Sequence, residues 1–356
     1  MKFDLLALDE NFNVITPLVA TNIQWRRKWF EAGTFSIEVP VSQYSKDIAY
    51  IYTKDRTEVG KITQVNYMLD HGVQEIHLSG YFLEEELNRM ICYSKFNTSN
   101  IIDQPTWTMQ KGKAEDVAHA YFNAFKTIKF DNKTFDLGIA EGENLHRGVR
   151  AEHGRYSETL GHKIYKILKP SGMSYRVNLD FLTCKKTFQT VKGRDLTQEN
   201  TEQNNPVVFG TAFGNVEKVD YLFSDSEEKT GYIVKNKNTE ENNETTTIVA
   251  GCENDENYKF LALDSSENAS DYSTSADLME ALKVEGHQEV LKNKAKISFD
   301  IDTVPQSYEY LVDYDLGDVC TLSIPEIHFQ KNAIISGCIE TIKSGSFELT
   351  LEFEYI

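Results

Sequence analysis

The chain has 356 residues, a formal net charge of −18, and a composition that is 40% hydrophobic and 12% aromatic. This length exceeds what one hydrophobic core usually organises, so we expect two or more domains. The aromatic content and the seven prolines indicate an ordered protein rich in β-structure. The acidic excess argues against sequence-independent binding to nucleic acid, which needs Lys and Arg to displace phosphate counterions. The simplest interpretation of this acidic excess is that it keeps the protein soluble.

The cysteines and the N-terminus indicate the compartment in which the chain folds. Five cysteines, an odd number, are widely spaced with no Cys-x-x-Cys pattern, so neither a disulfide framework nor a zinc site is expected. The first ten residues include acids and lack the apolar core of a signal peptide, and no later run is long enough to span a membrane. We therefore expect folding in a reducing cytoplasm, with no membrane segment.

Residues 22–40, NIQWRRKWFEAGTFSIEVP, predict the β-hairpin around which the N-terminal region is organised. From Phe35 onwards apolar and polar residues alternate, which is the pattern of a half-buried strand. Residues 31–33 supply the turn. We expect Trp25 and Phe35 on the buried face, and Pro40 ends the second strand because it has no N–H for the ladder.

The segments on either side of this hairpin predict further hairpins. Alternation and turn residues indicate strands over 3–8 and 14–18 before it, and over 58–68 and 74–80 after it. Apolar residues at helical spacing predict a short helix over 83–90. Consecutive hairpins over so short a span favour a small closed β-domain.

After residue 92 the pattern changes to mixed α and β, so residues 96–190 are expected to form an α/β insertion. Apolar residues recur there at the spacing of one helix face, and alternating strands follow. The predicted elements are helices over 113–128 and 157–168, the second capped by Ser157, and strands over 175–179 and 181–189.

An all-β pattern resumes near residue 191, interrupted by one helix. The polar stretch 236–247 is most simply an exposed hairpin tip. A helix is expected over 276–291. The predicted strands are 216–223, 230–234, 295–301, 319–324, 333–343 and 347–353.

We find no motif that carries chemistry. The chain has no glycine-rich phosphate loop, His-Glu-x-x-His helix or Gly-x-Ser-x-Gly elbow. The best local cluster is His146, His153 and His162 with Glu152 and Glu158, but its spacings match neither one helix face nor a familiar set of zinc ligands. Solvated or capping histidines are the simpler interpretation, so no catalytic, cofactor-binding or metal-binding residue is assigned.

The acidic stretch 310–320 is a second candidate. Asp313, Asp315 and Asp318 resemble a calcium loop at first sight, but the required Gly and closing Glu are not at their places. We interpret the stretch as a tight turn in which Gly317 takes a backbone conformation closed to other residues and Asp318 caps the turn.

Taken together, the order of these pieces resembles that of a known family. The matching residues are Trp25-Arg26-Arg27, Gly33-Thr34-Phe35, Glu38-Val39-Pro40, Glu58-Val59-Gly60 with Ile62, Ser79-Gly80 followed by Leu83, Leu87 and Arg89, Gly193-Arg194-Asp195, and Val312 to Val319. The family is that of the hub proteins at the distal end of long-tailed phage tails, also called baseplate hub or tail-associated proteins. The signature positions are structural: Trp25, Arg27, Gly33, Phe35, Pro40, Gly60, Gly80, Asp313, Asp315, Gly317 and Asp318.

The resemblance implies a mainly β fold with α+β insertions and two small β-barrel domains in each subunit of a homotrimer. Three subunits would then ring a DNA channel with six barrels and meet a six-fold tail. The expected domains are 1–95, 96–190, 191–235 joined to 295–356, and 236–294. The resemblance also implies a distal tail ring protein and other tail or baseplate proteins as partners, a place at the tip of the virion tail, synthesis in the bacterial cytoplasm, and no cofactor. DNA would pass without being bound specifically.

Two alternatives remain at this stage. One is a tail-associated cell-wall hydrolase with its site in residues 96–190, using carboxylates such as Glu152 and Glu158. The other is a carbohydrate-binding module that uses a groove of exposed Tyr and Phe rings. The acidity also has a second interpretation, because a channel lined with carboxylates would repel the DNA backbone.

Overall fold

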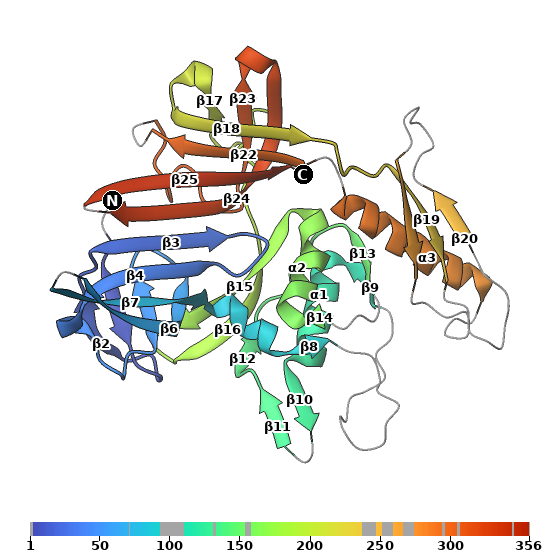
Figure 1. Ribbon diagram of the computed structural model, residues 1–356. Helices are drawn as coiled ribbons and strands as arrows, with labels where there is room; N and C mark the ends of the chain where they lie inside the picture. The colour runs from blue at the N-terminus through green and yellow to red at the C-terminus, as the bar shows by residue number, and fades with distance from the viewer. Residues whose placement is uncertain are drawn as a thin grey trace. The chain divides into compact units, whose positions relative to one another are not determined.

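The computed structural model divides into two compact units, Met1–Val219 with Asp300–Ile356, and Asp220–Phe299 (Figure 1). The unit boundaries fall inside two strands, β18 and β22. The residues that the structure describes are 3–70, 72–92, 110–130, 133–153, 158–236, 247–250, 259–265, 274–293, 296–304, 307–343 and 345–355. Every helix within these described residues is too short or too polar to cross a membrane.

The first unit is organised by a 13-stranded sheet. Its path runs β18-β22-β25-β24-β3-β4-β7-β6-β5-β1-β2, and β23 joins β24 to β17 beside this path. The strands of the N-terminal half are β1 (Leu5–Leu8), β2 (Val14–Leu18), β3 (Asn22–Lys28), β4 (Thr34–Pro40), β5 (Tyr50–Thr53), β6 (Val59–Asp70) and β7 (Val73–Phe82). Those of the C-terminal half are β17 (Val208–Gly210), β18 (Val216–Ser224), β22 (Lys296–Thr303), β23 (Val319–Ile324), β24 (Phe329–Lys343) and β25 (Ser346–Tyr355).

The two halves of the chain meet where β3 pairs with β24. The pairing is antiparallel and unbroken from Asn22 opposite Lys343 to Lys28 opposite Gly337. The hairpin β3–β4 therefore lies directly beside the hairpin β24–β25, as Figure 1 shows in blue and red. The mainly β fold class and the predicted hairpins are confirmed, whereas the two closed barrels and the four domain boundaries stay predictions.

Aromatic rings pack against a glycine in the N-terminal half. Trp25 is fully buried, and its ring centroid lies 4.7 Å from that of Phe82 and 5.8 Å from that of Phe35. A Cβ on Gly60 would lie 2.5 Å from the Phe35 ring, so only glycine lets this ring reach its place against β6. Alternation along β3 and β4 thus produces the expected apolar core.

The residues of the predicted α/β insertion form helices and short strands, and these share a core with the sheet. Its core contains Leu8, Tyr50 and Val59 of the N-terminal half, and the rings of Phe122 and Phe188 stack at 4.3 Å. The elements are the 3₁₀ helix η2 (Leu83–Arg89), β8 (Ile91–Cys92), β9 (Gln110–Lys113), α1 (Ala114–Phe125), β10 (Thr127–Phe130), β11 (Lys133–Asp136), β12 (Ile139–Glu141), β13 (Arg150–His153), β14 (Glu158–Thr159), α2 (Leu160–Leu168), η3 (Lys169–Ser171), β15 (Met173–Asp180) and β16 (Lys185–Lys192).

Three boundaries in this region differ from those predicted. Helix α2 begins at Leu160 with Thr159 as N-cap, because β14 is extended and pairs with β8; Ser157 lies outside the described residues. Helix α1 ends at Phe125 because the chain then enters the β10–β11 hairpin. The strand predicted over 181–189 starts only at Lys185, since the Asp180 carboxylate accepts hydrogen bonds from the turn that precedes it.

The second unit contains the remaining sheet and helix. Strand β19 (Gly231–Lys235) pairs antiparallel with β20 (Thr247–Ala250) and parallel with β21 (Phe260–Asp264). Helix α3 (Ser275–Lys292) begins at Thr274, whose hydroxyl accepts a hydrogen bond from the Asp277 N–H at 3.2 Å. Leu278 and Leu282 of this helix pack on Tyr232 and Val234. The polar stretch 236–247 lies outside the described residues except at its two ends.

The packing of Phe35 on Gly60 gives a test of this core. We expect Gly60→Ala to lower the free energy of unfolding by about 1–3 kcal/mol, because the added methyl group overpacks the ring. The Phe35→Leu change removes this ring. In that background Gly60→Ala should therefore lower the free energy of unfolding by less than it does in the native protein. Urea unfolding of the native protein, the two single variants and the double variant measures the coupling energy between positions 35 and 60. Strictly additive changes in the free energy of unfolding would contradict the packing of Phe35 on Gly60.

Candidate functional site

The most unusual polar feature of the first unit is an arginine inside its core. Residues of β3 alternate between the two faces of the sheet, so Ile23, Trp25 and Arg27 point inward while Arg26 points to solvent. Arg27 is almost fully buried. A guanidinium remains charged in proteins, so its burial requires acceptors and counter-charges placed around it.

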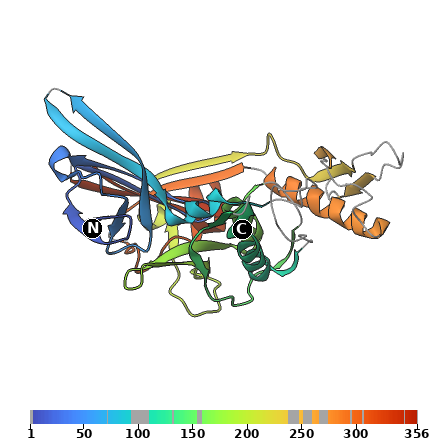
Figure 2. The same ribbon diagram turned by 90° about the horizontal axis from the view of Figure 1, so that it is seen from below.

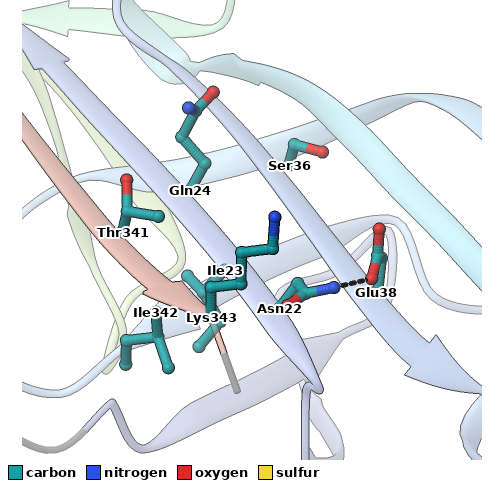
Figure 3. Close-up of a pocket in the computed structure, with 8 residues that line it drawn as sticks. All are labelled: Asn22, Ile23, Gln24, Ser36, Glu38, Thr341, Ile342 and Lys343. Atoms are coloured by element: carbon teal, nitrogen blue, oxygen red, sulfur yellow. Dashed lines mark hydrogen bonds between the residues drawn. The ribbon is translucent and has the colours of Figure 1, made fainter. Parts of the chain in front are cut away.

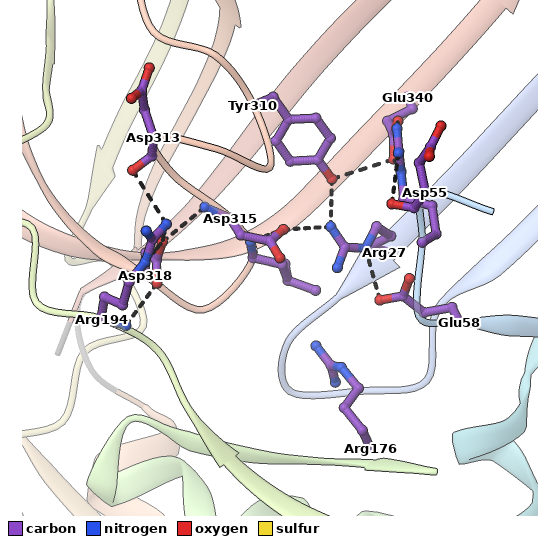
Figure 4. Close-up of polar contacts among 12 residues, drawn as sticks. Arg27, Asp55, Glu58, Arg176, Arg194, Tyr310, Asp313, Asp315, Asp318 and Glu340 are labelled. Atoms are coloured by element: carbon purple, nitrogen blue, oxygen red, sulfur yellow. Dashed lines mark hydrogen bonds and ion pairs between the residues drawn. The ribbon is translucent and has the colours of Figure 1, made fainter. Parts of the chain in front are cut away.

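Those partners come from both halves of the chain, as Figure 4 shows. The Arg27 Nε donates to Glu58 at 2.8 Å, and its Nη1 donates to the Tyr310 hydroxyl at 2.7 Å and to Asp315 at 2.6 Å. Burial opposes the charged form, but Glu58, Tyr310 and Asp315 together raise the pKa of Arg27. Although burial opposes its ionisation too, Arg27 lowers the pKa of Asp315.

A second ion pair extends this network. Arg56 is buried and donates through Nε to Glu340 of β24 at 3.0 Å, and a second nitrogen, Nη2, also contacts that carboxylate. Its guanidinium lies over the rings of Phe3 and Tyr310, 5.0 and 5.6 Å from their centroids. The Tyr310 hydroxyl donates to Glu340 at 3.4 Å. Arg27, Arg56, Glu58, Tyr310, Asp315 and Glu340 are called the junction network below.

The acidic turn beside the junction network is closed by a further arginine. Arg194 donates to Asp318 from its backbone N–H at 2.7 Å and from Nη2 at 2.6 Å, and the Asp315 N–H donates to the same carboxylate at 2.9 Å. Gly317 has a φ of +93°, and a Cβ there would overlap the indole ring of Trp29. The tight turn predicted for this stretch is confirmed, with Gly317 in the expected backbone conformation and Asp318 as its cap.

A third arginine connects the insertion to the same region. Arg176 of β15 lies over the Trp29 ring at 4.9 Å, and its Nε is 3.9 Å from the Glu84 carboxylate. Glu84 is buried. Burial raises the pKa of Glu84 to about 7, and Arg176 only partly offsets this effect.

The geometry of the junction network is that of a structural clamp. Asp313, Asp315 and Asp318 each accept hydrogen bonds from different protein groups, so they do not converge on one point where a cation would sit. Within the described residues no group of three or more His, Cys, Asp or Glu side chains is placed to hold a metal. The arrangement joins chain segments, because each carboxylate of the junction network contacts an arginine from another segment.

The described side chains bring together only part of the histidine cluster considered from the sequence, since the His162 Nε2 lies 3.9 Å from the Glu158 carboxylate. His146 pairs with Asp116 at 2.5 Å, while Glu158 contacts Lys163 at 3.2 Å and Lys166 at 2.6 Å. Burial opposes ionisation of Glu158, but the lysines lower its pKa overall, which suits a structural ion pair better than a general acid. The side chains of Glu152 and His153 lie outside the described part of the structure.

A shallow pocket lies on the solvent face of the sheet at the β3–β24 junction. It has a volume of about 250 Å³ and is lined by Asn22, Ile23, Gln24, Ser36, Glu38, Thr341, Ile342 and Lys343 (Figure 3). The Glu38 carboxylate already accepts a hydrogen bond from Asn22 and contacts the His77 ring. Burial opposes its ionisation, yet these partners lower its pKa, so Glu38 is a paired surface carboxylate.

The sequence of the chain matches one known protein family over most of its length. A sequence profile of the siphovirus ReqiPepy6 Gp37-like proteins matches residues 8–353. The chain belongs to this family. The resemblance to phage proteins noted from the sequence is thereby confirmed, and no curated protein matches the chain.

Solved structures show that this siphovirus family member shares its fold with prophage tail proteins. It is similar to the 43 kDa tail protein of prophage MuSo2 from Shewanella oneidensis, with a TM-score of 0.57 and 10% identity over 100% of this chain and 98% of that one. A tail protein from Neisseria meningitidis gives 0.53 and 11% over 99% and 96%. Prophage tail protein gp18 from Listeria monocytogenes gives 0.53 and 12% over 98% and 94%.

The structure places the signature positions of the sequence in two groups. Those around the first hairpin form the aromatic core or lie beside it, with Gly80 against the backbone of β6 and the half-buried Pro40 at the end of β4: Trp25, Gly33, Phe35, Pro40, Gly60 and Gly80. The others, Arg27, Asp313, Asp315, Gly317 and Asp318, lie in or beside the junction network. Sequence reasoning missed Arg56, Tyr310 and Glu340. The inward phase of Glu340 in the alternating strand IISGCIETI was a signal that could have identified it.

Neighbouring arginines on β3 provide a matched test of the junction network. We expect Arg27→Met to lower the free energy of unfolding by about 3–5 kcal/mol, because Glu58 and Asp315 lose their counter-charge inside the protein. Arg26→Met removes only a solvent-exposed contact with Glu352 and should cost less than about 1 kcal/mol. Urea unfolding at neutral pH measures both changes. Equal effects would contradict a clamp centred on Arg27.

Glu84 gives a pH-dependent test. Its pKa of about 7 in the folded protein exceeds its ordinary value, so the folded state holds the proton more tightly than the unfolded chain. The free energy of unfolding of the native protein should therefore fall, relative to that of Glu84→Gln, by on the order of 3 kcal/mol as pH rises from about 4.5 to above 7. Urea unfolding at several pH values measures this difference, and a constant difference would rule out the raised pKa.

Proposed function

We propose that the chain is a non-enzymatic, structural tail-tip hub of a siphovirus or prophage. In this proposal three copies form a ring that docks on the distal tail ring protein, closes or continues the DNA channel, and organises the parts that contact the host. The protein is made in the bacterial cytoplasm and ends at the tip of the virion tail. Subunit rearrangement after receptor contact opens the path for DNA.

The observation that carries this proposal is the pairing of two hairpins, one from each half of the chain, within one sheet. The hairpins β3–β4 and β24–β25 lie side by side through the β3–β24 ladder. In the proposed ring each of these hairpins counts as one segment, so three copies would contribute six. A three-fold ring built in this way can match a six-fold tail. Two barrels, over 1–95 and over 191–235 with 295–356, are the form that we propose for these segments.

The solvent face of the junction is suited to face the channel. It is polar, and its charges are paired, since Arg26 contacts Glu352 at 3.0 Å and Glu38 contacts His77. Such a face presents few free cations to DNA phosphates, which limits adhesion. The acid-lined channel stays a hypothesis, because these pairs leave few free carboxylates and the acidic excess must come from other residues.

The hydrolase alternative lacks support from the described insertion. Its candidate Glu158 is held by two lysines, and none of the three similar structures is described as an enzyme. Exposed aromatic rings of the described residues, such as Tyr67, Phe135 and Phe213, lie on separate elements and so do not recommend a sugar-binding groove.

Solution mass tests the hub proposal. Light scattering on the purified full chain, at low and high concentration and with the distal tail ring protein added, should detect three copies of the chain, alone or in the complex. A strict monomer under all of these conditions would refute the trimeric hub.

A further inference from the structure

The hairpin β6–β7 extends beyond the sheet that carries it. Strand β5 pairs only with the Val59–Lys61 end of β6, whereas β6 and β7 continue to pair up to Asp70 opposite Val73. The light-blue hairpin in Figure 2 projects away from the rest of its unit. Residues 64–70 are called the arm, which spans about 20 Å at the rise of a β-strand.

One face of the arm continues the apolar face of the core. Val65 lies opposite Leu78 and Tyr67 opposite Ile76, and both partners on β7 are buried. Residues directly opposite each other in an antiparallel pair share a face, so Val65, Tyr67 and Leu69 point to the side of the sheet that is covered elsewhere. Yet they are 45%, 52% and 60% exposed. Val65, Tyr67 and Leu69 thus form a row of apolar side chains on the core-facing side of the strand that remain about half exposed.

Up to Asp70 at its tip the arm also lacks charge, which is unusual in this chain. Residues 63–69, TQVNYML, contain no Asp, Glu, Lys or Arg, although the whole chain has a net charge of −18. A second surface has the same character. Residues 11–25 are likewise uncharged, and within them Val14 and Val19 are 58% and 70% exposed at the edge strand β2. Like-charged copies of the chain can meet at these two surfaces without adding repulsion.

We propose that the arm of one copy packs its Val65, Tyr67 and Leu69 stripe on the β2 surface of a second copy. The contact is head-to-tail, since the two surfaces differ, and such contacts form closed rings when the rotation closes. Every arm in a ring then finds its cover on the next copy. Three side chains cover much less than the roughly 1,600 Å² of a stable interface, so the arm adds to the ring contact. This inference rests on the proposed assembly of copies.

Alternation on β6 supplies a matched pair of variants. Tyr67→Ser/Leu69→Ser removes the stripe, and we expect it to weaken self-association by about 10- to 100-fold. The control, Gln64→Ser/Asn66→Ser, changes exposed residues of the opposite face and should leave self-association unchanged. Light scattering over a concentration series measures both, and thermal unfolding establishes that both variants fold.

A photo-crosslinking amino acid in place of Tyr67 identifies the occupant. The expected product is a covalent dimer of the chain, linked to a peptide from residues 11–25. Cross-links to the distal tail ring protein alone would overturn the arm contact, and so would equal self-association of the two serine variants. In either case a trimeric native chain would leave the hub proposal intact. A native chain that never self-associates would overturn both the arm contact and the hub proposal, so the solution mass of the native chain distinguishes the two failures.

Discussion

The structure depends on a buried arginine at the place where the two halves of the chain meet. Arg27 lies on the inward face of β3, and its acceptors come from residues about thirty and nearly three hundred positions away in the sequence. A buried guanidinium that lost one acceptor would leave uncompensated charge in the core. The β3–β24 ladder and the acidic turn must therefore form together, which makes the two halves one cooperative unit around this charge.

The same junction fits the proposed role of the chain in assembly. On the inner side, charges are satisfied by one another, and Trp29 packs over Gly317. On the outer side, polar residues of two adjoining hairpins form a continuous face, with Arg26 and Glu352 paired across β3, β24 and β25. In the proposed ring this face would be repeated in every copy, because a ring repeats one interface.

Local patterns predicted most of the strands, since period-two alternation depends on burial of one face and Trp25 and Phe35 display it plainly. The helix start at Leu160 was missed because the pairing of β14 with β8 overrides the local cap signal of Ser157. The signature residues Arg27, Asp315 and Asp318 were identified by resemblance, but their shared network was not, because contacts between β3 and residues 310–318 depend on the tertiary pairing. The exposed stripe on the arm likewise has the sequence pattern of an ordinary half-buried strand. Only the structure shows that its apolar side chains are exposed.

Electron microscopy of the assembled tail tip is the decisive experiment for the proposed hub. We expect three copies of this chain in a ring, with the β3–β4 and β24–β25 hairpins of each copy placed as two successive segments of a nearly six-fold wall around the channel. A reconstruction in which the chain forms no ring, or in which these two hairpins lie away from the channel wall, would contradict it.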